Sequence, residues 1–279
     1  MIDKLEHNNK LDNFKTIINN INIRKNHIGS LDIQIVDHCN LNCAGCDHFS
    51  PIAKEWYENI ENFKKLMNRL KKILCNKKLF NINIMGGEPL LHKDIEEFCH
   101  ITRNIFNDAE IKIVTNGTLL KLKDKNFFNN LKLYDIKLDI TNYSDSNKMF
   151  YKTNISCNDN NKSIYSNCIN NCYNINYTKK NIDNSLYEFY NDFQCCQLNS
   201  NGDFYFCIIP ANIRHFNKFF SYNFNTIKNK DYINIYDIDN INEIIKGLNR
   251  ELHFCKYCNK HECKKWGVSK LDKYEWLKR

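Results

Sequence analysis

The stretch CNLNCAGC, residues 39–46, brings Cys39, Cys43 and Cys46 together in a CX3CX2C pattern on one short segment. It follows directly on the run LDIQIVD, residues 31–37, in which apolar and polar side chains alternate as they do in a β-strand. Three thiolates on one loop can bind three irons of a cubane cluster and leave the fourth iron open. A zinc site is the alternative, although zinc sites favour paired CX2C units. We therefore predict an iron–sulfur cluster with one open iron at the end of this strand.

A second motif, MGGEP at residues 85–89, ends the apolar run FNINI of residues 80–84 one strand–helix unit later. Its two glycines lack a Cβ atom, so the backbone at Gly86 and Gly87 can come unusually close to a ligand. The motif is weak on its own, but its position one unit after CX3CX2C makes the combination specific. We therefore treat the two motifs as parts of one signature.

This signature resembles that of the radical SAM superfamily, in which the open iron chelates the amino and carboxyl groups of S-adenosylmethionine (SAM). The resemblance implies that one electron from the [4Fe-4S] cluster cleaves SAM to methionine and a 5′-deoxyadenosyl radical, which abstracts hydrogen from a substrate. The family usually has an aromatic residue just before the third cysteine. This chain has Gly45 there, and we expect His48 and Phe49 to supply that packing. The SAM-contacting motif that the resemblance implies consists of Gly86, Gly87, Glu88 and Pro89.

Strand-like and helix-like patterns alternate through residues 31–157. Such repeats predict a parallel sheet with the functional residues at the carboxyl ends of its strands. The repeats are too short for a complete eight-unit barrel, so the predicted fold class is α/β, a partial (β/α)6 TIM-like barrel. The expected strands are 31–37, 80–85, 111–115, 134–141 and 153–157, and the expected helices are 59–75, 94–106, 124–131 and 145–151.

The pattern changes near residue 195, where 195–207 predicts a β-hairpin that turns at Asn201-Gly202. A helix at 240–251, a CX2C motif at 255–258 and a terminal helix ending near Trp276 are expected to follow. We therefore divide the chain into an N-terminal extension (1–30), the partial barrel (31–193) and a small cysteine-rich domain (194–279).

The cysteines of the last domain resemble the auxiliary-cluster regions called SPASM and twitch. One four-thiolate cluster fits their number better than two, and a four-cysteine zinc site is the alternative. The expected ligands are Cys196, Cys207, Cys255 and Cys258, with Cys195 and Cys263 as alternatives. The pair Cys168 and Cys172 has no assigned role.

Several further residues are candidates for binding or catalysis. The resemblance places three polar residues at strand ends on the SAM side of the barrel: Thr115, Asn116 and Thr141. Candidate substrate contacts are Lys137 and Asp139, which alternate with apolar residues in 134–141, and Arg214 and His215, which follow the hairpin. Cys157, at the end of an expected strand, is a candidate hydrogen donor, although a buried structural cysteine is the more common role.

The composition limits the functional class. The chain has 279 residues, a net charge of +8 and 14 cysteines, and 42% of its residues are hydrophobic. No apolar run reaches the ~20 residues of a membrane span, and residues 1–30 are too polar for a signal peptide. We therefore expect a cytoplasmic protein whose cysteines serve metal or redox chemistry. The positive charge suits an anionic substrate or an acidic electron donor such as flavodoxin or ferredoxin, and no nucleic-acid-binding module is recognisable.

These patterns favour a radical SAM oxidoreductase that acts on a small polar metabolite, such as a sugar or cyclitol derivative. The auxiliary cluster would accept the second electron of a dehydrogenation. The alternatives are a radical SAM epimerase, or a peptide (RiPP) maturase that uses a separate recognition protein. A metal-stabilised binding protein that no longer cleaves SAM is the alternative from another class, and the intact motifs argue against it.

Overall fold

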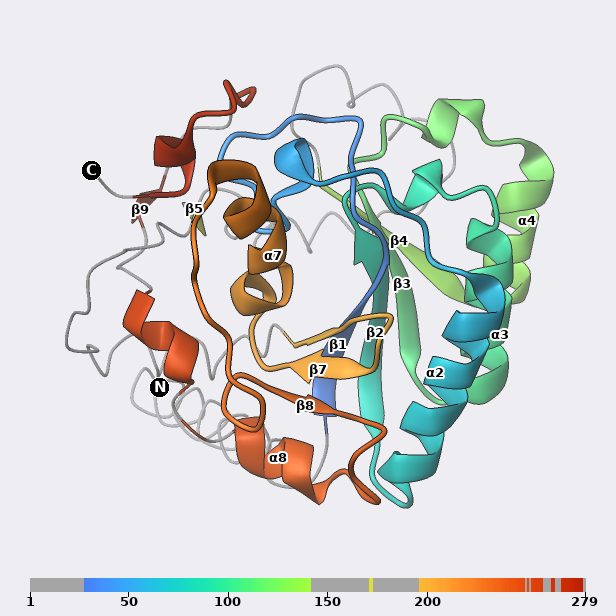
Figure 1. Ribbon diagram of the computed structural model, residues 1–279. Helices are drawn as coiled ribbons and strands as arrows, with labels where there is room; N and C mark the ends of the chain where they lie inside the picture. The colour runs from blue at the N-terminus through green and yellow to red at the C-terminus, as the bar shows by residue number, and fades with distance from the viewer. Residues whose placement is uncertain are drawn as a thin grey trace, which may run out of the picture.

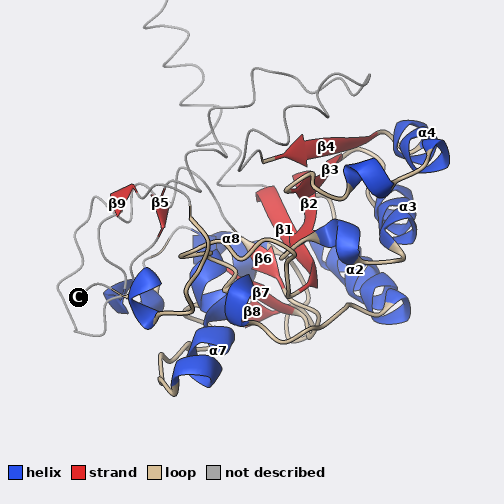
Figure 2. Cartoon of the chain, turned by 90° about the horizontal axis from the view of Figure 1, so that it is seen from above, coloured by secondary structure: helices blue, strands red, loops and turns tan. Residues whose placement is uncertain are grey.

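The computed structural model describes residues 28–141, 171–172, 196–248, 250, 252–257, 262–263 and 267–277. Its centre is a seven-stranded sheet with the order β4-β3-β2-β1-β6-β7-β8, shown in Figures 1 and 2. The strands of this sheet are β1 (Ile28–Val36), β2 (Leu79–Gly86), β3 (Glu110–Thr115), β4 (Ile136–Ile140), β6 (Gln197–Leu198), β7 (Asp203–Tyr205) and β8 (Tyr232–Asn234).

Strands β1 to β4 are parallel, and β6 adds a further parallel strand on the free side of β1. Strands β7 and β8 complete the sheet in antiparallel fashion. This arrangement confirms the predicted α/β class and its parallel sheet. The expected helix 145–151 and strand 153–157 lie outside the described residues.

Helices follow the first three strands as the sequence patterns predict. They are α2 (Ile60–Leu74), α3 (Ile95–Ile105) and α4 (Lys125–Leu133). Asn59 caps the start of helix α2, because its side chain accepts hydrogen bonds from the backbone N–H groups of Glu61 and Asn62. Figure 2 shows the three helices on one side of the sheet, with α7 (Ile208–Phe220) and α8 (Asn242–Leu248) on the other.

The alternation predicted for the strands separates an apolar face from a polar one. Ile33 lies in register with Ile84, which lies in register with Ile113, and all three are fully buried. One residue along, Asp32 lies in register with Asn83, and the Asn83 Nδ2 donates to Asp32 Oδ1 over 2.7 Å. Asp32 and Asn83 are buried as well, because both faces of the sheet are covered at these central strands.

The predicted hairpin is present as β6 and β7, and Gly202 occupies its turn with a φ of +88°. Strand β6 pairs with β1 through the register Asp32↔Gln197. The sheet is therefore continuous across the boundary predicted at residue 194, and the three-part division of the chain stays a prediction.

The chain after the hairpin differs from its sequence pattern in two places. Helix α7 starts directly after Cys207 and was not among the predicted elements. The terminal helix predicted to end near Trp276 is wrong over residues 267–277, which form an extended segment and the short 3-10 helix η7 (Lys273–Glu275). The physical reason is that this segment pairs with another part of the chain instead of with itself, since Val268 forms an antiparallel bridge with Cys43.

The remaining elements are short. Strands β5 (Asn171–Cys172) and β9 (Glu262–Cys263) form a separate antiparallel pair. The other 3-10 helices are η1 (Ser50–Ile52), η2 (Pro89–Leu91), η3 (Leu120–Leu122) and η6 (His253–Tyr257). Within the part of the chain that the structure describes, no helix is both long and apolar enough to cross a bilayer.

Arg69 on α2 joins the first helix to the segment after β8, and its removal should lower stability. Its Nε donates to the Ile235 carbonyl over 2.9 Å and its Nη2 to the Ile238 carbonyl over 2.6 Å. Arg69→Ala leaves two carbonyls without these donors, so we expect the free energy of unfolding to fall by about 1–3 kcal/mol. Urea unfolding measures the change. Lys72→Ala, on the exposed side of α2, is the control, and its free energy of unfolding should stay within about 0.5 kcal/mol of wild type. An equal loss of unfolding free energy in both variants would contradict the role of Arg69.

Candidate functional site

The cysteine loop begins where β1 ends, at the carboxyl edge of the parallel strands. Cys39, Cys43 and Cys46 are all partly exposed. Gly45 has a φ of +69°, a backbone conformation that the aromatic residue expected there would adopt only with strain. Phe49 is fully buried and its ring centroid lies 5.8 Å from that of Phe216, and its expected packing role at the cluster stays a prediction. His48 is buried beside it.

The surroundings of Cys39 suit a thiolate ligand. Its Sγ accepts a hydrogen bond from the Leu41 backbone N–H at 3.3 Å and one from the Asn116 side-chain amide at 3.6 Å. Without a metal, burial raises the pKa of Cys39 to about 12 and also raises that of Cys46. Binding a metal therefore has to displace protons from these thiols.

A cluster fits this donor set better than a single ion does. Among the described residues, no three His, Cys, Asp or Glu side chains converge closely enough to hold one metal ion. A cubane differs from a single ion because each thiolate binds a different iron, so the sulfurs surround the cluster rather than one point. The loop offers three partly exposed cysteines, and two N–H donors are directed at the sulfur of Cys39, which suits a cluster with one open iron.

The two glycines of the GGEP motif permit backbone contact with the cysteine loop. Gly87 N–H donates to the Val36 carbonyl over 2.9 Å and Glu88 N–H donates to the His38 carbonyl over 3.0 Å. A Cβ atom added to Gly86 would lie 2.1 Å from the Val36 oxygen, and one added to Gly87 would lie 2.0 Å from the His38 oxygen. The protein's own backbone therefore lies close to these glycines and fixes GGEP beside the loop, while the predicted contact of GGEP with SAM stays a prediction.

Glu88 links the ends of the second and third strands. Its fully buried carboxylate accepts hydrogen bonds from Thr115 Oγ1 at 2.6 Å, Asn116 N–H at 2.8 Å and Leu90 N–H at 3.0 Å. Burial raises the pKa of Glu88, and these three donors oppose that rise. Pro89, at the first position of η2, needs no N–H partner there.

Asn116 continues the connection to the cysteine loop. Its amide donates to Asn40 Oδ1 over 2.8 Å, as well as to Cys39 Sγ. Thr141 joins the same strand edge, because its N–H donates to the Thr115 carbonyl over 2.9 Å. The sequence analysis did not single out Asn40, although a polar side chain inside the motif was a signal that could have identified it.

Asp37, two residues before the first cysteine, is bound by α7. Arg214 Nη2 lies 3.0 Å and 3.2 Å from the two Asp37 oxygens, and His215 Nε2 lies 3.3 Å from Oδ2. Burial raises the pKa of Asp37, but the His215 and Arg214 contacts outweigh it and hold the pKa below its ordinary value. The two candidate substrate contacts on α7 are therefore ion-pair partners of Asp37, and their role toward a substrate stays a prediction.

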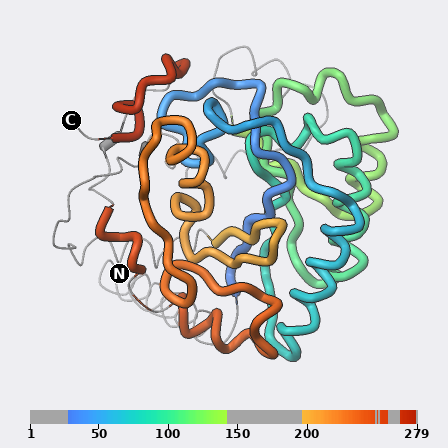
Figure 3. The backbone as a smooth tube through the Cα atoms, viewed as in Figure 1, coloured from blue at the N-terminus to red at the C-terminus, as the bar shows by residue number. Residues whose placement is uncertain are grey.

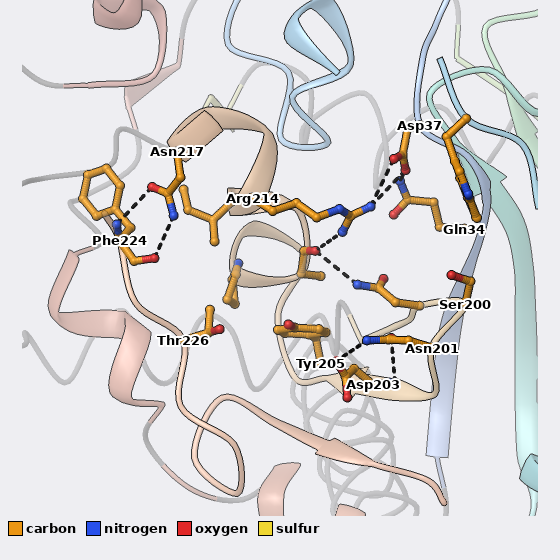
Figure 4. A pocket seen from close by; sticks show the side chains of 15 residues that line it. Gln34, Asp37, Ser200, Asn201, Asp203, Tyr205, Arg214, Asn217, Phe224 and Thr226 are labelled. Atoms are coloured by element: carbon orange, nitrogen blue, oxygen red, sulfur yellow. Dashed lines mark hydrogen bonds and ion pairs between the residues drawn. The ribbon is translucent and has the colours of Figure 1, made fainter. Parts of the chain in front are cut away.

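A pocket of about 420 Å³ lies beside this ion pair, between β1, the β6–β7 hairpin and α7. Figure 4 shows Arg214 reaching from α7 to Asp37 at its upper edge, with Tyr205 and Asp203 of the hairpin below. Gln34, on β1, also lines it and donates to Asp37. The lining combines charged side chains of both signs, from Asp37, Asp203 and Arg214, with apolar ones such as Trp56 and Phe224.

The two candidates on β4 differ in their surroundings. Lys137 is exposed and pairs with Glu110, which also pairs with Lys112 over 2.8 Å. Asp139 lies in register with Val114 and is half-buried, and burial raises its pKa. Both stand at the free edge of the sheet within the described residues.

The predicted auxiliary ligands are described only in part. Cys196 and Cys207 are buried, and burial raises the pKa of Cys196, with smaller contributions from Asp32 and Cys207. Cys255 is half-buried in η6. The backbone of Cys263 and Cys172 is described but not their side chains, while Cys157, Cys168, Cys195 and Cys258 lie outside the described residues.

Comparison with known proteins identifies one family and a set of relatives. The family described as the Radical SAM superfamily matches residues 33–173. A GTP 3′,8-cyclase of Campylobacter jejuni is 32% identical over 126 residues, which make up 45% of this chain and 39% of that protein. A GTP 3′,8-cyclase of Clostridium botulinum is 30% identical over 136 residues, 44% of this chain and 41% of that protein. The matches thus span about two fifths of the curated relatives.

Solved structures give more distant similarities. The structure of BtrN in complex with AdoMet and 2-DOIA aligns with a TM-score of 0.49 at 16% identity, covering 84% of this chain and 93% of that one. Histidine-tagged anSMEcpe with bound AdoMet aligns with a TM-score of 0.44 at 15% identity, covering 85% of this chain and 89% of that one.

The contact between GGEP and the cysteine loop can be tested with a glycine substitution. Gly87→Ala forces a Cβ against the His38 carbonyl, so we expect a loss of stability on the order of 1–3 kcal/mol and reduced iron retention after anaerobic reconstitution. Lys72→Ala, at an exposed position on α2, is the control. Urea unfolding and iron analysis measure both effects. Wild-type iron content in Gly87→Ala would show that the close approach does not fix the loop.

Proposed function

The chain belongs to the radical SAM superfamily, and from this membership we propose that it is an oxidoreductase that dehydrogenates a small polar metabolite. The observation that supports SAM chemistry most directly is the backbone pairing of Gly87 and Glu88 with Val36 and His38, which holds the GGEP motif beside the cysteine loop. Enzymes of this superfamily use a [4Fe-4S] cluster and SAM. When bound, the two together supply a 5′-deoxyadenosyl radical that abstracts hydrogen from a substrate carbon.

We assign the residues of the chain as follows. Cys39, Cys43 and Cys46 would hold the cluster, and its open iron would be available to SAM. The GGEP backbone holds the loop in place, and Glu88 acts as a positioning residue because its carboxylate is already bonded to donors of the protein. Asn116 directs its amide at Cys39 Sγ, which favours the thiolate over the thiol.

The pocket next to Asp37 supports a small polar substrate. Its volume of about 420 Å³ lies within the range of small-molecule sites, whereas a precursor peptide would need a longer groove. Asp37, Asp203 and Arg214 supply charge, and Tyr205 supplies an aromatic wall. A sugar or cyclitol derivative presents hydroxyl groups that match such a lining.

The auxiliary cysteines support oxidation as the reaction class. Hydrogen abstraction from a carbon that bears a hydroxyl leaves a substrate radical, and loss of one proton and one electron from it gives a ketone. The electron requires an acceptor, and Cys196, Cys207, Cys255 and Cys258 are proposed to hold it as a second cluster. The Cys196 carbonyl accepts a hydrogen bond from Asp32 N–H over 2.8 Å, so the hairpin is anchored on the strand that leads into the first cluster loop.

The likeness to GTP 3′,8-cyclases supports shared SAM chemistry but not a shared substrate. It covers 39% of the Campylobacter jejuni protein, so it does not carry that protein's substrate over to this chain. Epimerisation and peptide maturation are the alternative reactions. We also propose that a flavodoxin or ferredoxin supplies the electron for SAM cleavage and that the protein works in the cytoplasm.

Cluster content tests the cofactor assignment. Anaerobically reconstituted protein should bind about eight irons per chain, four in each cubane, and the reduced protein should release 5′-deoxyadenosine from SAM. Replacing Cys39, Cys43 and Cys46 together by Ala should remove one cluster and all SAM cleavage. Cys75→Ser, at an exposed cysteine on the end of α2, is the control and should leave both unchanged. About four irons together with bound zinc would refute the second cluster.

The mass of the product tests the reaction class. Dehydrogenation predicts a product lighter by two hydrogens, with one 5′-deoxyadenosine formed for each substrate consumed. Mass spectrometry of reactions with candidate polyols and sugars makes the measurement. A product of unchanged mass in H2O that gains one deuterium in D2O would indicate an epimerase, and a new carbon–carbon or carbon–sulfur bond in a peptide would indicate a maturase.

A further inference from the structure

Residues 267–277, which we name the C-terminal strap, lie along the cysteine loop. Figure 3 shows this segment, in red, beside the blue loop that follows β1. The Ala44 N–H donates to the Gly267 carbonyl over 2.8 Å, and the Ser269 N–H donates to the Asn42 carbonyl over 2.6 Å. Together with the bridge between Cys43 and Val268, these bonds make the strap a short antiparallel partner of the loop.

Trp276, near the other end of the strap, forms a hydrogen bond with the backbone of the third cysteine. Its indole Nε1 donates to the Cys46 carbonyl over 2.8 Å, and the side chain is 1% exposed. The indole centroid lies 5.9 Å from the ring of Phe49 and 6.0 Å from that of Phe220. Burial fixes the position of the indole N–H, so the hydrogen bond in turn fixes the carbonyl of Cys46.

The strap is braced by its own side chains. The Glu275 carboxylate accepts hydrogen bonds from the Ser269 hydroxyl and from the Lys270 N–H at 2.5 Å. Asp272 caps η7 by accepting from the Tyr274 N–H over 3.0 Å. These bonds close residues 269–275 into a preformed turn, so the strap presents a fixed surface to the loop.

We propose that the C-terminal strap is a wall of the cluster site and that Trp276 is a positioning residue for Cys46. This rests on the proposed role of the cysteine loop as the cluster ligand. Gly87 and Glu88 hold the strand that enters the loop, while the strap holds the backbone of residues 42–46, which carries the second and third cysteines. Loss of the strap leaves backbone groups of Asn42, Ala44 and Cys46 without these partners, and the loop gains freedom that cluster binding must remove.

Two substitutions separate this positioning role from simple packing. Trp276→Phe keeps an aromatic ring and removes the N–H donor. Leu277→Ala is the matched control, since Leu277 is buried in the same segment and its truncation leaves the indole bond in place. We expect Trp276→Phe to lose cluster iron to a chelator about twofold to tenfold faster than wild type, the range that one hydrogen bond gives, and to change the electron paramagnetic resonance signal of the reduced cluster.

Hydrogen exchange provides a readout that needs no cluster. In the metal-free protein, the amide hydrogen of Ala44 should exchange faster in Trp276→Phe than in Leu277→Ala. The two variants are compared at urea concentrations that lie equally far below their own unfolding midpoints. Equal exchange and equal iron loss in the two variants would overturn the positioning role of Trp276. Failure of the wild-type protein to bind iron or cleave SAM would refute the proposed function instead, and the exchange result would still decide whether the strap holds the loop.

Discussion

The site depends on parallel backbone pairing that continues beyond the strand ends. Gly87 N–H and Glu88 N–H bond to the carbonyls of Val36 and His38, so the segment after β2 follows the chain into the cysteine loop. Only residues without a Cβ fit at Gly86 and Gly87, where that atom would lie about 2 Å from a carbonyl oxygen. The Glu88 carboxylate in turn accepts hydrogen bonds from Thr115 and Asn116 at the end of β3. The absence of a Cβ at the two glycines therefore allows the ends of β1, β2 and β3 to be joined.

Helix α7 connects Cys207, one of the predicted auxiliary ligands, to the region of the cysteine loop that carries Cys39, Cys43 and Cys46. It begins directly after Cys207 and, farther along, places Arg214 and His215 against Asp37. Strand β1 makes the second connection, since it leads into the cysteine loop and also pairs with β6, which follows Cys196. The hairpin and Asp37, which precedes the cysteine loop, are therefore joined by packed elements.

The sequence was sufficient wherever a feature is local. Alternation in residues 31–37 and 80–85, the spacing of Cys39 to Cys46 and the turn at Gly202 depend on neighbours in the chain, and each is found in the structure. The sequence was insufficient to predict α7, because Cys207, which precedes the first residue of this helix, forms no side-chain hydrogen bond that caps it. The contact of Arg214 with Asp37 spans 177 positions, and no local pattern specifies such a partner. The GGEP glycines were located correctly, but the backbone that crowds them belongs to a strand far earlier in the sequence.

The bond from Trp276 to Cys46 also has a consequence for biosynthesis. Ribosomes add about 5–20 residues per second, so on the order of 10–50 s separate the synthesis of Cys46 from that of its partner 230 positions later. During this interval the nascent chain exposes three thiols on a segment held from one side alone. A metal ion that arrives then meets a loosely held loop, whereas a cluster delivered after release from the ribosome meets a loop held on both sides. The order of translation and metal delivery thus becomes part of how the site is made.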